Sequence, residues 1–311
     1  MKPKIVVIGS ANTDMIVTTN KIPTAGETIL GDRLMQSLGG KGANQAVAAA
    51  RLGADVTFIA RLGKDHFGQD ALEVYAKEGI NTKHIVQDEN EPTGIALIMI
   101  DSQGENIICV APGANAKLST IDISRAEEAI KSADCVLLQL EIPIKAVEFA
   151  IELASEHHVQ VILNPAPMTT LSKELLGKVD LLTPNKTEAA ALIRDQTSHP
   201  TDLALKIKRE FGIKYVIITM GKKGAILLGL NSPSPTRISS FPVKSVDTTG
   251  AGDAFNGGLA VALARGENME DAVKYANAVG ALATTRFGAQ SSLPTMQEVK
   301  AFLERQAAKV R

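Results

Sequence analysis

The feature that most constrains the fold is a regular alternation of short apolar runs with longer segments of helical periodicity. The first apolar run spans residues 4–8; an alanine-rich helical segment at 43–52 and a β-branched run at 56–60 follow. Strands that alternate with helices in this way are typical of βαβ units, which build a mostly parallel sheet. The sequence therefore predicts an α/β fold: a doubly wound, mostly parallel sheet flanked by helices on both faces.

The same alternation continues to the C-terminus of the 311-residue chain, which is long enough for one large domain or two smaller ones. Further helices are expected at 67–77, 124–132, 145–157, 187–193, 202–210, 251–265, 269–286 and 296–309. Further strands are expected at 136–140, 161–163, 179–182, 215–219, 224–230 and 236–243.

Two stretches, 15–38 and 93–110, interrupt the alternation because they lack helical periodicity and contain turn residues. The second reads as a hairpin, with apolar runs at 95–100 and 106–110 around a glycine-containing loop. Neither ribbon can bury both faces alone, so we expect them to pair into a small sheet that covers the core crevice or a partner subunit. The expected division is a core of 1–14, 39–92 and 111–311, with a β-sheet lid of 15–38 and 93–110.

Composition excludes several classes of protein. Lys and Arg total 33 against 34 Asp and Glu, so no net field attracts nucleic acid or an anionic membrane. Cys109 and Cys135 lie in apolar runs rather than paired motifs, which predicts neither disulfides nor a zinc site and favours a reducing compartment. The N-terminal apolar run at 5–8 is too short for a signal peptide or membrane span, so a cytoplasmic location is expected.

The strongest chemical motif is Asp-Thr-Thr-Gly-Ala-Gly-Asp at 247–253, between a strand and an apolar helix. The small residues Gly250, Ala251 and Gly252 leave the backbone N–H groups of the helix start open to a phosphate. Asp253 lies in the first helical turn, where it could accept a proton from a hydroxyl that attacks phosphorus. The alternative is that this acid only complements the helix dipole.

A second glycine cluster, Gly-Gly-Lys-Gly-Ala-Asn at 39–44, opens the helix near residue 43. Its spacing is not that of a Walker loop, because no Ser or Thr follows the lysine. We expect close backbone approach to a ligand here, with Asn44 either at the ligand or acting as a helix cap. Polar residues also follow the expected strand ends, namely Asn12, Asp14, Glu141 and Asn164. Carboxylates and amides from several strand ends form a set that could read sugar hydroxyls.

Two further turns are chemically ambiguous. Asn185 and Glu188 could hold a hydrated Mg²⁺ through water, but the same spacing is that of a helix capping box. The glycine turn at 219–224 could pass beneath a nucleotide, but it is equally a hairpin connection. No Ser-His-Asp or Cys-His arrangement stands out.

Two of these stretches, GGKGANQAVAAARLGADVTFIARLG at 39–63 and DTTGAGDAFNGGL at 247–259, resemble the two signatures of the ribokinase-like (PfkB) carbohydrate kinases. The resemblance covers essentially the whole chain. It includes GSANTD at 9–14, PTAGET at 23–28, GENIICVAPGAN at 104–115, LQLEIP at 138–143, NPAP at 164–167, TPNKTE at 183–188 and ITMGKKG at 218–224.

The resemblance implies ATP-dependent phosphorylation of D-ribose at O5 to give ribose 5-phosphate and ADP, and a lid sheet that also forms a homodimer contact. It implies that Asp253 is the general base, with the backbone amides of Ala251, Gly252 and Asp253 stabilising the transferred phosphoryl group. The implied sugar-binding residues are Asn12, Asp14, Gly40, Lys41, Asn44, Glu141 and Asp253. The implied residues for ATP and Mg²⁺ are Asn185, Glu188, Thr219, Gly221, Gly224, Gly252 and Asn277. Activation by K⁺ or a similar monovalent cation is implied at Asp247, Thr249, Ala283, Arg286, Gly288 and Ser292.

Three other functions compete with this reading. A kinase for deoxyribose or another sugar would differ by few side chains in the pocket, and a non-catalytic sugar sensor would keep the fold without turnover. A dinucleotide-dependent dehydrogenase is disfavoured, because GSANTD and not a G-x-G-x-x-G turn follows the first strand.

Overall fold

The computed structural model describes residues 2–308 and confirms the predicted α/β fold, with a nine-stranded sheet at its centre. The strand order across this sheet is β13-β12-β11-β10-β9-β8-β1-β4-β5. Its strands are β1 (Lys4–Ile8), β4 (Asp55–Gly63), β5 (Ile85–Asp88), β8 (Cys135–Leu138), β9 (Gln160–Leu163), β10 (Leu181–Leu182), β11 (Tyr215–Thr219), β12 (Ala225–Leu228) and β13 (Thr236–Ile238). All neighbours pair in parallel except β11 with β12 and β12 with β13.

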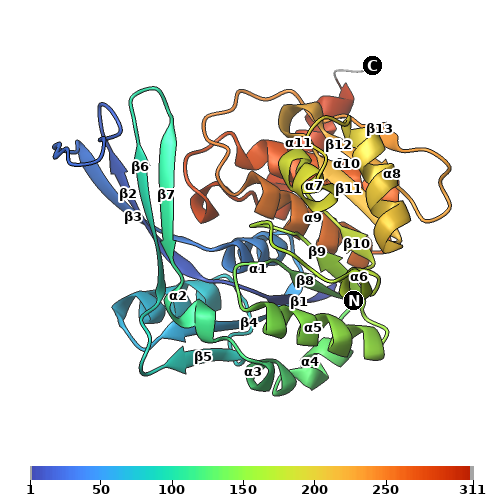
Figure 1. Cartoon of the computed structure of the whole chain (residues 1–311), viewed down its shortest axis with the longest axis horizontal. Helices are drawn as coiled ribbons and strands as arrows, with labels where there is room; N and C mark the ends of the chain where they lie inside the picture. The colour runs from blue at the N-terminus through green and yellow to red at the C-terminus, as the bar shows by residue number, and fades with distance from the viewer. Residues whose placement is uncertain (1, 309–311) are drawn as a thin grey trace.

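Helices cover both faces of the sheet, as Figure 1 shows for α1 and α9 on one side and α5 on the other. The longer helices are α1 (Lys41–Arg51), α2 (His66–Lys77), α5 (Ile144–Glu156), α7 (Lys186–Ile193), α8 (Pro200–Phe211), α9 (Ala251–Ala264), α10 (Met269–Ala283) and α11 (Met296–Ala308). Successive side chains of a strand point to opposite faces. Accordingly Ile5 and Val7 of β1 join the core layer beneath α1, α9 and α10, whereas Val6 and Ile8 join the layer beneath α5 and α8.

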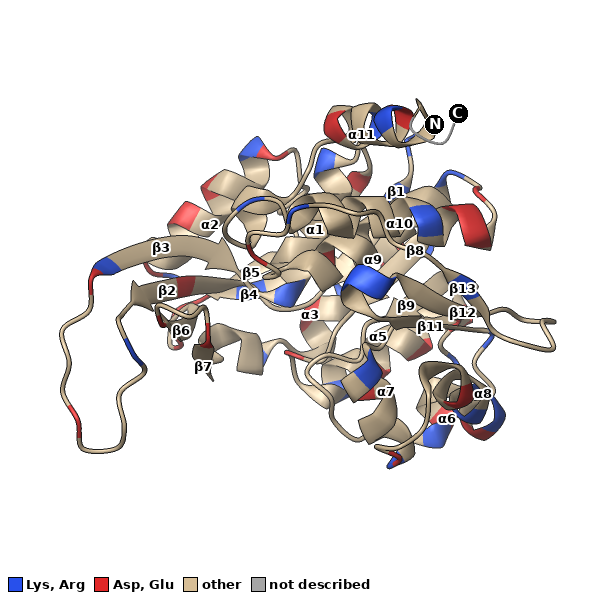
Figure 2. Ribbon diagram, turned by 90° about the horizontal axis from the view of Figure 1, so that it is seen from above, with Lys and Arg blue, Asp and Glu red and all other residues tan. Residues whose placement is uncertain are grey.

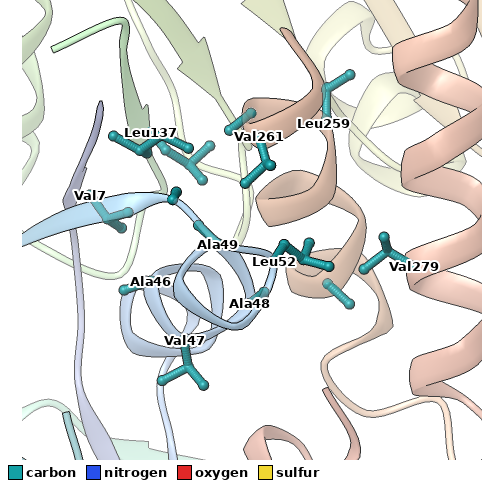
Figure 3. Close-up of a cluster of buried hydrophobic side chains, with 14 of the residues drawn as sticks. Val7, Ala46, Val47, Ala48, Ala49, Leu52, Leu137, Leu259, Val261 and Val279 are labelled. Atoms are coloured by element: carbon teal, nitrogen blue, oxygen red, sulfur yellow. The ribbon is translucent and has the colours of Figure 1, made fainter. Parts of the chain in front are cut away.

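The contact between α1 and α9 brings the two glycine motifs together. The facing side chains are small, and Figure 3 shows Ala48 and Ala49 of α1 beside the α9 ribbon. Gly257 of α9 has no room for a side chain, because an added Cβ would lie 2.6 Å from the Cβ of Ala48. This close packing holds the first turn of α1 against the first turn of α9.

The two interrupting ribbons form one four-stranded sheet, which confirms the prediction that they pair. Its strands are β2 (Asn12–Thr18), β3 (Arg33–Gly39), β6 (Gly94–Ile100) and β7 (Asn106–Ala111), in the order β3-β2-β6-β7. Figures 1 and 2 show this lid sheet projecting from the body of the molecule. β2 already begins at Asn12, so the lid sheet starts three residues before the predicted boundary at 15 and carries Asp14.

Some predicted elements differ in detail. The helix expected at 124–132 is two short helices, α3 (Thr120–Ser124) and α4 (Glu127–Lys131), and a capping box of Ser119 with Asp122 starts the first of them. The strand β5 and the short helix α6 (Lys173–Leu176) were not predicted, because neither is long enough to show a period. Residue 309 of the last predicted helix lies outside the described residues.

Figure 2 shows Lys and Arg interspersed with Asp and Glu over the molecule rather than gathered on one face. Within residues 2–308, no helix is long and apolar enough to cross a membrane.

Candidate active site

The predicted base Asp253 lies at the meeting point of α1 and α9, where the structure buries its side chain. Its two carboxylate oxygens accept hydrogen bonds from different amides of α1. Asn44 Nδ2 donates to Oδ2 at 2.9 Å, and Gln45 Nε2 donates to Oδ1 at 2.9 Å. The carboxylate is therefore held from both sides by residues about 200 positions earlier in the chain.

The electrostatics of this carboxylate are set by opposing influences. Burial raises the pKa of Asp253 above its ordinary value, while Lys41 and the amides of Asn44 and Gln45 oppose that rise. Reciprocally, Asp253 is the main reason that the pKa of Lys41 is raised, with smaller contributions from Glu141 and Glu188. An acid held between a cation and two hydrogen-bond donors can accept a proton and remain fixed in direction.

The first turn of α9 offers open backbone donors beside Asp253. Gly250 caps the helix at a φ of 73°, in the left-handed region that favours glycine. The first N–H of the helix, that of Ala251, bonds to the carbonyl of Thr248, whereas an added Cβ on Gly252 would meet nothing within 4 Å. This turn therefore presents approachable N–H groups at the positive end of the helix dipole, as an anion requires.

Two more carboxylates face the same place from other elements. Asp14 reaches it from β2 of the lid sheet, and burial, reinforced by Glu141 and Asp253, raises the pKa of Asp14 to about 7. Glu141 follows β8, and its Oε2 accepts hydrogen bonds from Ser10 Oγ at 2.5 Å and from the backbone N–H of Lys41 at 3.0 Å. Three acids and one lysine thus line one buried site, a set suited to neutral hydroxyl groups that both donate and accept.

The remaining predicted sugar residues lie at the same site. Gly40 caps α1 at a φ of 86°, and an added Cβ would be 2.8 Å from the backbone nitrogen of Asn12. Asn12 Oδ1 accepts a hydrogen bond from Asn115 Nδ2 at 2.7 Å. The Oδ1 of Asn44 is buried without a partner among the described residues. A buried acceptor without a donor is costly, so this oxygen calls for a ligand hydroxyl.

We expect Asp14 to make folding stability pH-dependent in a direction opposite to that of a salt-bridged acid. Because its folded-state pKa lies near 7, above its ordinary value of 3.8, the folded protein holds a proton that the unfolded chain has released between these values. Its contribution to the free energy of unfolding is present at low pH and is lost as the pH rises through about 7. Asp14→Asn should therefore be more stable than the wild type at about pH 8, with the difference shrinking toward about pH 4.

Urea denaturation of both proteins across this pH range measures the effect. The exposed residue Asp32, also in the lid region, provides a matched control as Asp32→Asn. Parallel pH profiles for the wild type and Asp14→Asn would contradict the buried, proton-binding state of Asp14.

The predicted nucleotide residues come from α7, from the end of β11 and the turn after it, and from α10. Asn185 and Glu188 form a reciprocal capping box, with Asn185 N donating to Glu188 Oε2 at 2.8 Å and Glu188 N donating to Asn185 Oδ1 at 2.9 Å. Asn185 also bridges to Thr219 at the end of β11. The capping alternative is thus confirmed as the structural role of this pair, and a role in holding Mg²⁺ stays a prediction.

The glycine turn at 219–224 and Asn277 converge on the end of β13. Gly221 opens a short 3₁₀ turn (Gly221–Lys223), and Gly224 precedes Ala225, which pairs with Ile238. Asn277 of α10 donates from Nδ2 to the carbonyls of Ile238 at 3.2 Å and Ser239 at 3.4 Å. These residues, drawn from three separate parts of the sequence, therefore share one region of the fold.

Of the residues expected around a monovalent cation, Asp247, Thr249 and Gly288 lie together next to the start of α9. Asp247 accepts hydrogen bonds from Thr249 N at 2.9 Å, Thr249 Oγ1 at 2.7 Å and Gly288 N at 2.8 Å. Ser292 donates to the carbonyl of Ala289 at 2.8 Å, Ala283 ends α10, and the Arg286 side chain pairs with Glu298 instead of pointing into the cluster. Among residues 2–308 no group of three or more His, Cys, Asp or Glu gathers as a metal site, so beyond the Asp247 carboxylate any cation here would depend on hydroxyl and carbonyl oxygens.

Sequence reasoning missed several side chains that support the site, namely Ser10, Gln45, Asn115 and Gln139. Gln45 follows Asn44 on a helix, and no local pattern distinguishes it from a residue on the solvent face. Asn115 lies in the block at 104–115 that carried the resemblance, so that block was the available signal. Asn164, expected near the sugar, instead bonds to Gln45 beneath Asp253.

Comparison with known proteins agrees with this geometry. The pfkB family of carbohydrate kinases matches residues 2–296. A ribokinase of Haemophilus influenzae is 42% identical over 309 residues, which cover 98% of this chain and 99% of the relative. A deoxyribokinase of Salmonella typhi is 36% identical over 306 residues, covering 96% of this chain and 98% of the relative.

Among solved structures, that of Arabidopsis thaliana ribokinase complexed with ribose and ATP superposes with a TM-score of 0.89 at 34% identity. The match covers 97% of this chain and 99% of the plant protein. With the family match spanning nearly the whole chain and two signatures meeting at one buried acid, the protein belongs to the pfkB family of carbohydrate kinases.

Proposed function

We propose that this protein is an ATP-dependent ribokinase that phosphorylates D-ribose at O5. The observation that carries the proposal is the meeting of Asp253, held by Asn44 and Gln45, with the open first turn of α9. A carboxylate beside an anion site is the arrangement that phosphoryl transfer to a hydroxyl requires. Identity of 42% to a ribokinase over nearly the full length supports ribose as the sugar.

In this proposal the sugar lies among Asn12, Asp14, Gly40, Lys41, Asn44 and Glu141, with its O5 hydroxyl toward Asp253. Asp253 removes the O5 proton as that oxygen attacks the γ-phosphorus, and the bond from phosphorus to the bridging oxygen of ADP breaks. The N–H groups of Gly252 and Asp253 stabilise the negative charge on the transferred group, and that of Ala251 joins them on releasing the Thr248 carbonyl. Lys41, close enough to Asp253 to have its pKa raised by it, opposes the rise that burial causes in the pKa of Asp253.

The nucleotide and Mg²⁺ are proposed to lie between Asn185, Glu188, Thr219, Gly221, Gly224 and Asn277. The carboxylate of Glu188 is half-buried at the rim and keeps free lone pairs beyond its capping bonds, which suits water-mediated contact with the ion. When bound, Mg²⁺ would neutralise part of the charge on the phosphates.

An activating K⁺ or similar ion is proposed at Asp247, Thr249, Ala283, Arg286, Gly288 and Ser292. The residues present suit such an ion, because Asp247 supplies one carboxylate and the adjoining turns supply carbonyl and hydroxyl oxygens. Arg286 can contribute only its backbone carbonyl, since its side chain pairs with Glu298.

Both cysteines are free thiols, which supports the proposal of a reducing, cytoplasmic compartment.

The experiment that tests the sugar is a coupled ADP-release assay with ribose, 2-deoxyribose, fructose and adenosine, each with and without K⁺. Ribose should give the highest kcat/KM, and K⁺ should increase it. A higher kcat/KM for 2-deoxyribose would favour deoxyribokinase activity. The 36% identity to a deoxyribokinase supports this alternative. No turnover with any sugar would favour a non-catalytic sugar sensor.

The lid sheet is proposed to form a homodimer contact. Its face away from Asp14 carries Leu34, Leu97, Met99 and Ile107, all of which are exposed. Contiguous apolar surface of this kind is uncommon on a monomer and typical of an interface.

Leu97→Asp should convert the dimer to a monomer, because it places a charge in the centre of this apolar face. Sedimentation velocity measures the change. Ile121→Asp is the matched control: Ile121 is 61% exposed, as Leu97 is 57% exposed, but it lies in α3 outside the lid sheet. A Leu97→Asp protein that sediments like the wild type would remove the lid from the interface.

A further inference from the structure

A chain of buried side-chain amides lies directly behind Asp253. Gln45 Nε2 donates to Asp253 Oδ1 at 2.9 Å and to Asn164 Oδ1 at 3.3 Å. Gln45 Oε1 accepts a hydrogen bond from Gln139 Nε2 at 2.6 Å. Gln45 and Gln139 are both fully buried, so neither can contact solvent or a bound sugar. They act on the site only through Asp253.

The direction of every bond in this chain is fixed by one backbone carbonyl. Asn164 Nδ2 donates to the carbonyl oxygen of Thr183 at 3.2 Å, and a carbonyl can only accept. The Oδ1 of Asn164 must therefore accept the hydrogen bond from Gln45, and the donor must be Gln45 Nε2. The reversed amide of Gln45 would face oxygen to oxygen against both Asn164 and the carboxylate of Asp253. Gln139 then donates to the oxygen that remains.

The amide chain is also enclosed sterically. Gly9 at the end of β1 leaves space for Gln139, since an added Cβ there would lie 2.0 Å from Gln139 Oε1. On the other side, Thr183 Oγ1 donates to Asn256 Oδ1 at 2.6 Å, and Asn256 Nδ2 donates to the carbonyl of Gly252 at 2.9 Å. The same residue that orients Asn164 is thus linked to the first turn of α9.

We propose that Gln45 is the positioning residue of the catalytic base: locked by Asn164 and Gln139, it donates one hydrogen bond that holds the Asp253 carboxylate in its reactive direction. The inference rests on the proposed role of Asp253 as the base. The buried amides are therefore assigned a role in catalysis and not in packing alone. They have one permitted orientation, and in that orientation the last hydrogen bond is donated to the reacting carboxylate of Asp253.

Other charged groups face Asp253 and must be included in any pH argument. Lys41 from α1 favours the anion, whereas Glu141 after β8 opposes it, and Asp14 from β2 and Glu188 from α7 also interact with Asp253. The Gln45 bond adds to the effect of Lys41 in lowering the pKa of Asp253. Removal of this bond should therefore raise that pKa.

The test is the pH dependence of kcat/KM for Gln45→Leu, which replaces the hydrogen-bond donor with an apolar side chain of comparable bulk. We expect kcat to fall by about 10- to 100-fold, as for a misplaced catalytic group. The ribose KM should change by less than about threefold, since Gln45 does not touch the sugar. The acid limb of the kcat/KM profile should move to higher pH. Gln87→Leu, at the exposed position of β5, is the matched substitution, and we expect it to leave the kinetics unchanged.

A double variant separates positioning from packing. Gln45→Leu leaves Gln139 Nε2 without its acceptor and should lower the melting temperature. Gln45→Leu/Gln139→Leu removes both partners, so its melting temperature should recover in part while kcat stays at the single-variant level. Recovery of kcat together with stability would overturn the proposal, as would an unshifted acid limb in Gln45→Leu. If Gln45→Leu fails to fold, the same kcat and pH-profile measurements are made on the double variant alone. A wild-type kcat or an unshifted acid limb in that protein would overturn the proposal.

Asp253→Asn is measured beside these proteins to distinguish two failures. Turnover retained in Asp253→Asn would refute the role of Asp253 itself. An inactive Asp253→Asn together with wild-type kinetics and pH profile in Gln45→Leu would refute only the role of Gln45.

Discussion

Asp253→Asn is expected to lower kcat by about 10²- to 10⁴-fold, the usual range for losing a general base. An amide cannot take the O5 proton, although it fills the same space between Asn44 and Gln45. Steady-state kinetics with ribose and ATP measure the loss, and circular dichroism with thermal melting checks that the variant folds.

Asp271→Asn is the control that excludes the simpler role of a helix-dipole partner. Asp271 occupies the first turn of α10 just as Asp253 occupies the first turn of α9, but it is exposed and accepts a bond from Asn268 Nδ2. If Asp253 only complemented the helix dipole, both variants would lose stability by a similar small amount and keep their activity. Near-normal turnover in a folded Asp253→Asn would contradict its role as the base.

Asp14→Asn should raise the ribose KM by about 10- to 150-fold with a smaller effect on kcat. A hydrogen bond from a sugar hydroxyl to a buried carboxylate is worth roughly 1.5–3 kcal/mol, and its loss would appear in binding. Because the pKa of Asp14 is about 7, ribose affinity should also weaken as the pH falls below that value, as the carboxylate becomes protonated.

Isothermal titration with ribose in the absence of ATP separates binding from turnover in this experiment. Asp32→Asn, on the exposed lid loop, should bind ribose as the wild type does. Unchanged affinity in Asp14→Asn would place the sugar away from β2. The same variant should be more stable than the wild type above neutral pH, so a gain in stability and a loss of affinity are expected in one protein.

Much of the fold could be predicted because its signals are local. The strand at 4–8, which is buried from Ile5 onward, follows from a continuous apolar run, and the alanine-rich helix that ends at Arg51 follows from a period of 3.6. The error at 124–132, where two short helices replace one, arose because the Ser119 capping box starts a helix earlier than apolar periodicity indicates. The lid boundary was wrong by three residues because β2 continues directly from the loop after β1.

The residues of the candidate site also divide into those with a local sequence signal and those without one. Gly40, Gly250 and Asp253 could be proposed from the sequence because glycine turns and first-turn acids have characteristic spacing. The sequence also singled out Asn185 and Glu188, but it could not distinguish a capping role from a cation-binding role. Reciprocal capping and cation binding use the same two oxygen-bearing side chains. Gln45 and Gln139 could not be found, because a buried glutamine has no local signature.

The sequence by itself determined that the chain forms a layered α/β core with two glycine-bordered helix starts and an acid in the first turn of the second. Only the tertiary structure decided that Asn44 and Asp253, 209 residues apart, hydrogen-bond to each other, and that Gln45 completes the contact. Secondary structure follows from interactions within a few residues, whereas this contact depends on how closely α1 and α9 pack. That distance is set by small side chains such as Ala48 and Gly257 meeting across the core.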